Sequence, residues 1–137
     1  MKVFIVFLAL AIINISMLVY DSDAQRYTEL QTNLKNAASE CSAGAALYYD
    51  QEEFAKGNMI FNREEGILFV EHFLEKEKKY ITCKKEYTIE YNISYEENIE
   101  NPAVITSLTM ITEDLFRLPA LEIKKIVRKS KYEFPEI

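Results

Sequence analysis

The sequence predicts an α+β protein with a long N-terminal helix, a second helix and a small antiparallel β-sheet. Three observations predict this fold class. An apolar run at Val3–Tyr20 continues, with no Gly or Pro, into a polar segment that has helical spacing. A second amphipathic segment follows at residues 62–79. After it, apolar and polar residues alternate with the two-residue period of a strand that buries one face.

The first element, Val3–Tyr20, has the length and composition of a membrane anchor. It carries no charge, and as a helix it would extend about 27 Å, close to the roughly 30 Å of a bilayer core. Lys2 precedes the run and acidic residues follow it, which predicts a cytoplasmic N-terminus. We therefore expect residues 1–20 to be a transmembrane anchor and residues 21–137 to be an extracytoplasmic domain. One set of anchor residues is expected to pack against partner helices: Val3, Phe4, Phe7, Leu8, Ala11, Ile15 and Leu18.

A cleavable signal peptide is the alternative interpretation of this start. The basic first residues, the apolar run and Ser22-Asp23-Ala24 before Gln25 are typical of a secretory signal. Cleavage after Ala24 would release a small secreted binding protein. The length of the apolar run and the acidic residues at the potential cleavage site favour a retained anchor. In both cases the rest of the chain is expected outside the cytoplasm.

Beyond Tyr20, small and apolar residues recur at steps of three and four, which is the spacing of one helix face. This spacing predicts a continuous helix from residue 3 to residue 49, with its outer half packed on a domain. Small residues between 37 and 46 would let another backbone approach closely. The face consists of Ala24, Tyr27, Leu30, Leu34, Ala37, Ala38, Cys41, Ala45 and Tyr48.

The second helix is predicted from Asn62 to Lys79, after a connector at residues 50–62 that is interrupted at Gly57. Asn62 is a suitable N-cap, with acidic residues in the first turn and lysines in the last turn, as the helix dipole favours. Its inner face is expected to hold Ile67, Val70 and Leu74, with support from Phe69 and Phe73.

Strands are predicted in the last third of the chain. Residues 81–95 alternate, with one parity that is mostly apolar, and residues 103–112 are rich in β-branched side chains. A polar turn at 96–102 would connect them. Residues 115–119 interrupt the pattern, and residues 121–134 are compatible with either a third strand or a short helix.

Composition restricts the class of partner. The net charge of −6 and the pI near 4.9 argue against nucleic acid, which requires a basic surface. A basic cluster near the C-terminus is interpreted as the solvated face of a terminal element, with contact to an acidic partner as the alternative. The cluster comprises Lys124, Lys125, Arg128, Lys129 and Lys131.

The residues give little support for catalysis. His72 is the only histidine and is interpreted as a surface residue of the second helix. The sequence has no HExxH motif, phosphate-binding loop or nucleophile elbow, so we expect neither an enzyme nor a cofactor or metal. Cys41 and Cys83 are either a disulfide between helix and sheet or buried free thiols. The tyrosines at 87, 91 and 95 are interpreted as the edge of the core rather than a ligand platform.

Two stretches and one strand carry a resemblance to a known family. The stretch at 36–50 reads NAASECSAGAALYYD, an Ala-rich helix end, and the stretch at 54–62 reads FAKGNMIFN before an amphipathic helix. Residues 103–112, followed by Leu115-Phe116-Arg117-Leu118-Pro119, look like the family's strand with an aromatic and proline ending. With these features the chain resembles the TadE/TadG-like minor pseudopilins of tight-adherence pilus systems in Gram-positive bacteria. The resemblance implies a type IV pilin-like fold.

The chain departs from the pilin pattern at its start. Pilin-like chains carry a Gly cleavage site before the apolar helix and a Glu a few residues into it. Here Met1-Lys2 leads directly into Val3, and the run contains no acidic residue. We therefore expect a non-enzymatic accessory subunit that keeps its anchor and acts through contacts with the membrane and with other pseudopilin or pilus-assembly subunits. No small-molecule substrate is expected.

Overall fold

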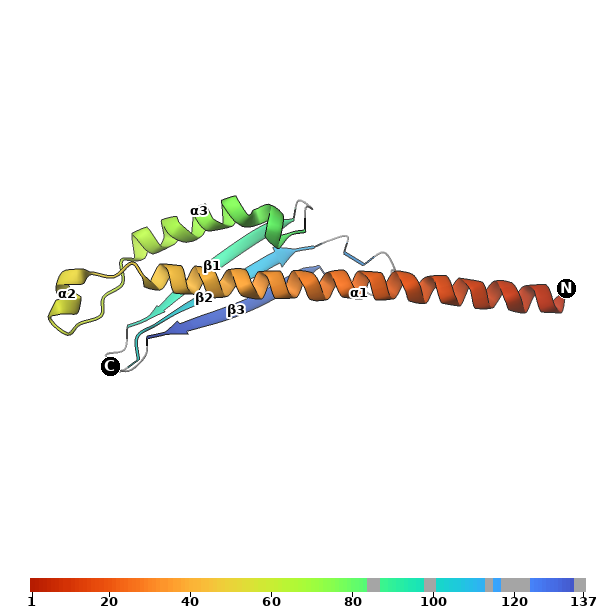
Figure 1. The fold of residues 1–137 in the computed structure, drawn as a ribbon, viewed down its shortest axis with the longest axis horizontal. Helices are drawn as coiled ribbons and strands as arrows, with labels where there is room; N and C mark the ends of the chain where they lie inside the picture. The colour runs from red at the N-terminus through yellow and green to blue at the C-terminus, as the bar shows by residue number, and fades with distance from the viewer. Residues whose placement is uncertain (84–86, 98–100, 113–114, 117–123, 135–137) are drawn as a thin grey trace.

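Helix α1 (Lys2–Ala46) runs most of the length of the molecule, and a second long helix and a three-stranded sheet lie along its second half (Figure 1). The computed structural model describes residues 1–83, 87–97, 101–112, 115–116 and 124–134. These residues also form helices α2 (Gln51–Ala55) and α3 (Arg63–Ile81) and strands β1 (Thr88–Glu96), β2 (Ala103–Ile111) and β3 (Lys125–Glu133). The predicted α+β class, with its long apolar N-terminal helix, is confirmed.

Helix α1 is uninterrupted because it contains no Pro and its one Gly, Gly44, stands near its end. The helix ends at Ala46, three residues before the predicted end at residue 49. Backbone pairing explains the difference: the Asp50 N–H donates to the Ile60 carbonyl at 2.8 Å, and the Asn62 N–H donates to the Tyr48 carbonyl at 2.8 Å. These bonds pair residues 48–50 with residues 60–62 and prevent the helix from continuing.

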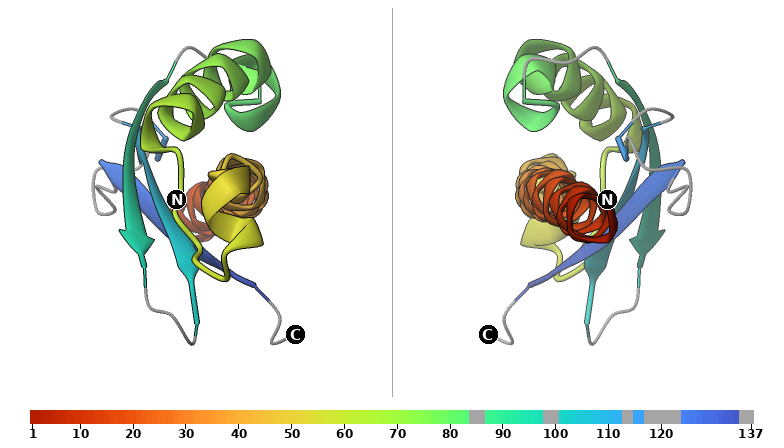
Figure 2. Two further views of the ribbon diagram at one scale, coloured as in Figure 1. Left: turned by 90° about the vertical axis from the view of Figure 1, so that its left-hand side faces the viewer. Right: turned by 90° about the vertical axis from the view of Figure 1, so that its right-hand side faces the viewer.

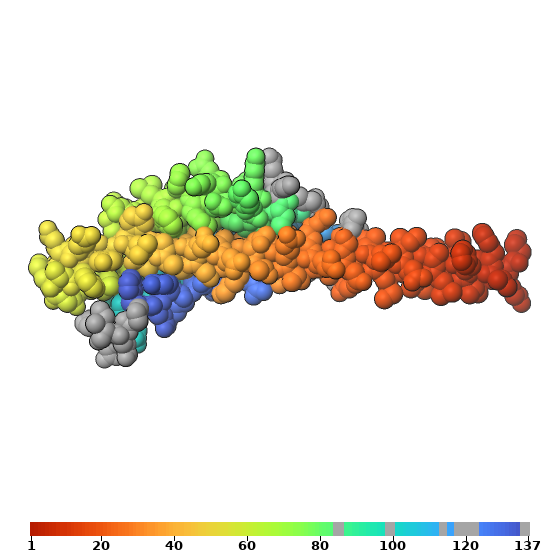
Figure 3. All heavy atoms as spheres, in the orientation of Figure 1, coloured from red at the N-terminus to blue at the C-terminus, as the bar shows by residue number. Residues whose placement is uncertain are grey.

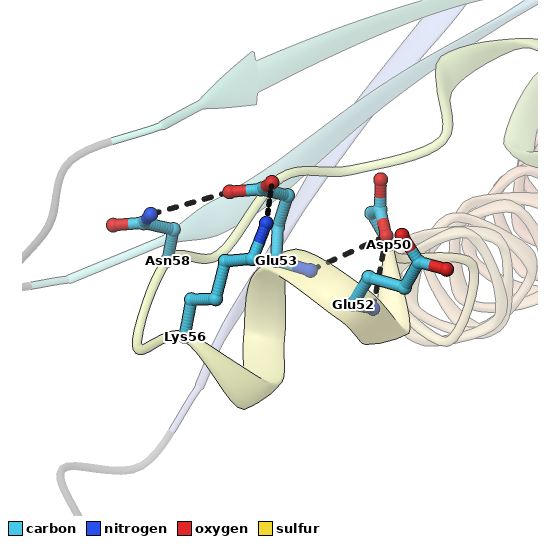
Figure 4. A network of polar contacts seen from close by, with 5 residues as sticks. All are labelled: Asp50, Glu52, Glu53, Lys56 and Asn58. Carbon is cyan, nitrogen blue, oxygen red and sulfur yellow. Dashed lines mark hydrogen bonds and ion pairs between the residues drawn. The ribbon is translucent and has the colours of Figure 1, made fainter.

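The connector between the long helices contains helix α2, which the sequence analysis missed. The Asp50 side chain accepts hydrogen bonds from the backbone N–H groups of Glu52 and Glu53 and so caps the helix (Figure 4). The Glu53 carboxylate in turn accepts from Lys56 at 3.3 Å and from Asn58 at 3.2 Å (Figure 4). At five residues the helix is too short to show a hydrophobic period.

Helix α3 begins after the predicted cap: the Asn62 side chain accepts from the Glu65 N–H at 3.3 Å. The predicted inner face is correct at Val70 and Leu74 and wrong at Ile67, which is 37% exposed. Gly66 lies on the inner face, where a Cβ would collide with the Tyr95 hydroxyl. The absence of a side chain at position 66 lets α3 approach the sheet. A pattern of apolar residues does not predict such a contact, because a glycine makes it.

The sheet has the order β1-β2-β3 and is antiparallel throughout. β1 begins at Thr88 rather than at Ile81, because α3 continues to Ile81 and the chain then turns at Cys83 with φ 53°. The face predicted to be buried is buried or half-buried at Tyr87, Ile89, Ile93 and Tyr95, whereas Tyr91 is exposed. Of the two possibilities for the last element, residues 125–133 form a strand. The predicted break at residues 115–119 lies mostly outside the described residues.

Both long helices lie on the same face of the sheet (Figure 2). The core lies between them and β2, whose inward residues Val104, Leu108 and Met110 are fully buried. Helix α1 contributes Leu30, Leu34, Cys41 and other residues of the predicted small and apolar face. The domain is therefore built around the second half of α1, whereas the first half of the same helix is apolar and uncovered.

Candidate membrane anchor and interaction surfaces

The first half of α1 projects from the domain with its apolar side chains uncovered (Figure 3). An 18-residue window of the helix has a mean hydropathy of 2.6 and is not buried against any other part of the molecule. Among the described residues, α1 is the one helix that is long and apolar enough to cross a membrane. Exposed apolar surface on this scale is costly in water, so this segment requires a lipid or protein environment.

The residues predicted to pack against partner helices all lie in this projecting half. Phe4 and Phe7 are 64% and 69% exposed, and Ala11 is half-exposed among its longer neighbours. Their packing against other helices stays a prediction. The full predicted set, Val3, Phe4, Phe7, Leu8, Ala11, Ile15 and Leu18, is available for contact.

Asn14 is an exposed amide inside the apolar segment. Its Nδ2 donates to the Leu10 carbonyl at 3.0 Å, one turn earlier in the helix. That bond satisfies one of the two amide hydrogens. An amide in the hydrocarbon region is expensive unless its polar atoms find partners, so Asn14 is the chemically distinctive position of the anchor.

The domain begins to cover α1 immediately after the apolar segment. Asp23 is fully buried, and the ring of Tyr27 packs against that of Phe116 with centroids 5.9 Å apart. Cleavage after Ala24 would therefore remove a residue that the folded domain buries. It would also cut the helix within the turn where domain contacts begin.

Of the two alternatives left open for the cysteines, a disulfide or free thiols, the structure contains free thiols at both positions. Cys83 accepts a hydrogen bond from Asn33 Nδ2 at 3.3 Å. Asn33 precedes Cys41 on α1 by about 12 Å of helix rise, whereas a disulfide requires Cα atoms within about 7 Å. The alternative of free thiols, with Cys41 buried, is the one the structure contains.

Neither thiol has the environment of a nucleophile. Burial raises the pKa of Cys41 to about 12, and the nearby Glu40 carboxylate adds to the increase. Burial also raises the pKa of Cys83, with Glu29 as a further cause. Since the thiolate is the reactive form, both cysteines are held in the unreactive state near neutral pH.

The tyrosines at 87, 91 and 95, in and just before β1, divide between the core and the surface. Tyr87 is buried and Tyr95 packs on the core, where its ring lies 5.4 Å from that of Phe61. The Arg63 guanidinium lies over the Tyr95 ring, 5.3 Å from its centroid. Tyr91 is at the surface and donates its hydroxyl hydrogen to Glu71. The core-edge interpretation is confirmed for Tyr87 and Tyr95.

The basic cluster lies around β3, at one edge of the sheet. Lys125, Lys129 and Lys131 occupy the face turned away from the helices, whereas Arg128 is half-buried on the other face. Lys131 pairs with Glu96 at 3.2 Å and Glu133 at 3.0 Å. Lysines on an edge strand discourage unwanted strand pairing, which agrees with a solvated face. Contact with an acidic partner stays untested.

Two further observations concern metal and small-molecule binding by the described residues. His72 is exposed on α3, as predicted, and within the described residues no group of His, Cys, Asp or Glu is arranged to hold a metal ion. A groove between α1 and α3 encloses about 130 Å³ and is lined by Asn33, Ala37, Phe73 and Tyr80, among others. Pockets for organic ligands usually exceed about 300 Å³.

Comparison with family models, with curated proteins and with solved structures found no match for this chain. The class of the protein is therefore defined by its own geometry: an α+β domain mounted on a helix that is long and apolar enough to span a membrane.

Proposed function

We propose that this protein is a non-enzymatic, single-pass membrane component of a bacterial pilus or secretion assembly system of the tight-adherence type. It acts through helix packing in the membrane and through protein contacts of its outer domain. The observation that carries the proposal is the continuity of α1, which is bare and apolar in its first half and is the central core helix of the domain in its second half.

This continuity supports a retained anchor over a cleaved signal. The burial of Asp23 and the ring contact between Tyr27 and Phe116 tie the domain to the helix directly at the membrane boundary. A secreted domain would be expected to fold independently of its signal segment. The Lys2 flank supports a cytoplasmic N-terminus and an external domain.

The layout also supports the resemblance to pilin-like subunits. In such an arrangement, long N-terminal helices pack side by side while the sheet domains remain outside the bundle. Here the domain covers only one side of α1 and leaves its opposite side exposed (Figure 2). The resemblance to TadE/TadG-like pseudopilins is the reason for proposing a tight-adherence system. The exposed side of α1 is the reason for proposing contact through helix packing.

The proposal is tested in two stages in the source organism. Alkaline carbonate extraction and intact-mass measurement should find the chain in the membrane, with its N-terminal segment retained and the domain digestible by external protease. Deletion of the gene should then remove surface fibres or secretion, and the full-length gene should restore them. A soluble product that begins at Gln25 would refute the anchored role and favour a secreted binding protein. Unchanged fibres and secretion in the deletion strain would refute the assembly role alone.

A further inference from the structure

The amide of Asn14 gives the anchor a potential contact point for a second helix. In the bilayer, Oδ1 and the second Nδ2 hydrogen of this side chain have no water to bind. The structure provides one partner, the Leu10 carbonyl at 3.0 Å. The apolar side chains on the same face, Phe7, Ala11 and Leu18, carry no hydrogen-bonding groups, so the remaining partners must come from outside the chain.

Position around the helix shows that this contact point is accessible. At about 100° per residue, Asn14 lies about 160° around α1 from Leu30 and from Leu34, which are buried under the domain. Thr32 lies on the same side as Asn14 and is exposed. The side of α1 turned away from the sheet is open along the domain (Figure 2). A neighbouring helix can therefore contact Asn14 without meeting the folded domain.

From these observations we infer that Asn14 joins the anchors of two copies of this chain in a parallel pair. This inference rests on the proposed membrane anchoring. Identical chains inserted in the same direction place Asn14 at the same depth. A carboxamide is both donor and acceptor, so each Nδ2 can donate to the partner's Oδ1 and both amides are satisfied by one symmetric contact.

The side chains around Asn14 suit such a pair. Phe7, Ala11, Asn14 and Leu18 follow one another at steps of four, three and four, which is the spacing of a left-handed helix seam. Ala11 is small and lets the two backbones approach beside the amide. Asp21 continues the same spacing, and two carboxylates there repel each other. This repulsion disfavours an extension of the seam beyond the apolar half of the helix.

The test uses the full chain, labelled at its N-terminus with a donor or an acceptor fluorophore and reconstituted into phosphatidylcholine vesicles. Energy transfer is measured as the protein-to-lipid ratio is varied. We expect transfer to rise as a specific pair forms, and Asn14→Leu to weaken association by about 3- to 15-fold. Asn14→Gln keeps both amide functions and should retain most of the association.

A matched control is available at Ser16, which lies about 160° around the helix from Asn14. Ser16→Ala should leave association unchanged. Equal association of the wild-type and Asn14→Leu chains would overturn the inference, as would association only after a different membrane protein is added. Vesicle flotation separates the two levels of the argument: a chain that fails to float refutes the anchor itself, whereas a floating monomer refutes only the pairing.

Discussion

At the scale of single residues, the two thiols show how burial controls reactivity. With a pKa of about 12, Cys41 is ionised in only about one molecule in ten thousand at pH 8. Cys83 is half-exposed and its pKa is also raised, though its sulfur is within reach of reagents. The two thiols are therefore expected to differ in their rates of chemical labelling.

We expect a thiol reagent at pH 8 to modify Cys83 slowly and Cys41 only after unfolding. Peptide mass spectrometry after timed labelling, with and without denaturant, measures both rates. Cys83→Ser should abolish labelling of the folded chain, while Cys41→Ser should leave it unchanged. Fast modification of Cys41 in the folded protein would contradict its buried position.

Gly44 is the second informative residue, because a side chain there would collide with the ring of Phe69. That ring cannot shift freely, since it packs against Tyr48 at 5.8 Å and Phe73 at 6.2 Å between centroids. Gly44→Ala gains helix propensity of about 1 kcal/mol but overpacks the contact between α1 and α3. The overpacking cost is expected to dominate.

The expected result for Gly44→Ala is a net loss of up to about 2 kcal/mol in the free energy of unfolding. Denaturant titration in mild detergent, followed by tyrosine fluorescence, measures it. Combining it with Phe69→Leu, which removes the obstructing ring atoms, should recover most of the loss. A Gly44→Ala chain as stable as the wild type would show that the ring moves away at no cost.

At the scale of elements, α1 is stabilised by its buried face rather than by its length. Leu34 is fully buried between the sheet and α3, whereas Thr32 is exposed two residues earlier. Leu34→Ala should lower the free energy of unfolding of the domain by about 2 to 5 kcal/mol. Thr32→Ala should change it by less than about 0.5 kcal/mol. Denaturant titration of the two variants in parallel checks the difference, and similar losses would mean that the helix packs differently.

The elements differ in how well the sequence predicts them, for physical reasons. Helices α1 and α3 have many turns of consistent spacing, and Asn62 marks a cap, so their existence and type were predictable. Helix α2 has a cap at Asp50 but too few residues for a period. The start of β1 was misplaced because residues 81–83 happen to alternate like a strand, while the hydrogen bond from the Thr82 N–H to the Lys78 carbonyl continues the helix.

The candidate site was predicted to the extent that it depends on composition. The apolar length of Val3–Tyr20 is visible in the sequence, whereas the exposure of the segment required the structure, because a buried core helix can be equally apolar. The relation of Asn14 to the covered face of α1 required knowledge of where the domain sits. The state of the cysteines also required the fold, because the distance along α1 between Asn33 and Cys41 separates two thiols that the sequence places in the same core.

At the scale of the whole molecule, the two halves of α1 are expected to be protected from hydrogen exchange in different ways. The segment 30–46 packs on one side against the sheet and α3, whereas the segment 3–20 is not buried against the rest of the molecule. Hydrogen exchange should therefore be slow at 30–46 in every medium. At 3–20 it should become slow only when detergent micelles or lipid are present.

Exchange measured by mass spectrometry, with and without micelles, checks this prediction, and peptides from 30–46 are the internal control. Slow exchange at 3–20 in plain buffer, at concentrations where the chain is monodisperse, would indicate that the segment folds back on the domain. Equal protection in both media would then contradict the role of this segment as a membrane anchor.

The unbroken passage of α1 from the apolar segment into the domain has a mechanical consequence. With no hinge between the two halves, the domain cannot turn independently of the anchor. A tilt of about 20°, common for helices in bilayers, would swing the far end of α1 sideways by roughly 13 Å, given about 39 Å of helix beyond Tyr20. Because bilayer thickness influences helix tilt, a change in thickness would displace the outermost surface of the domain.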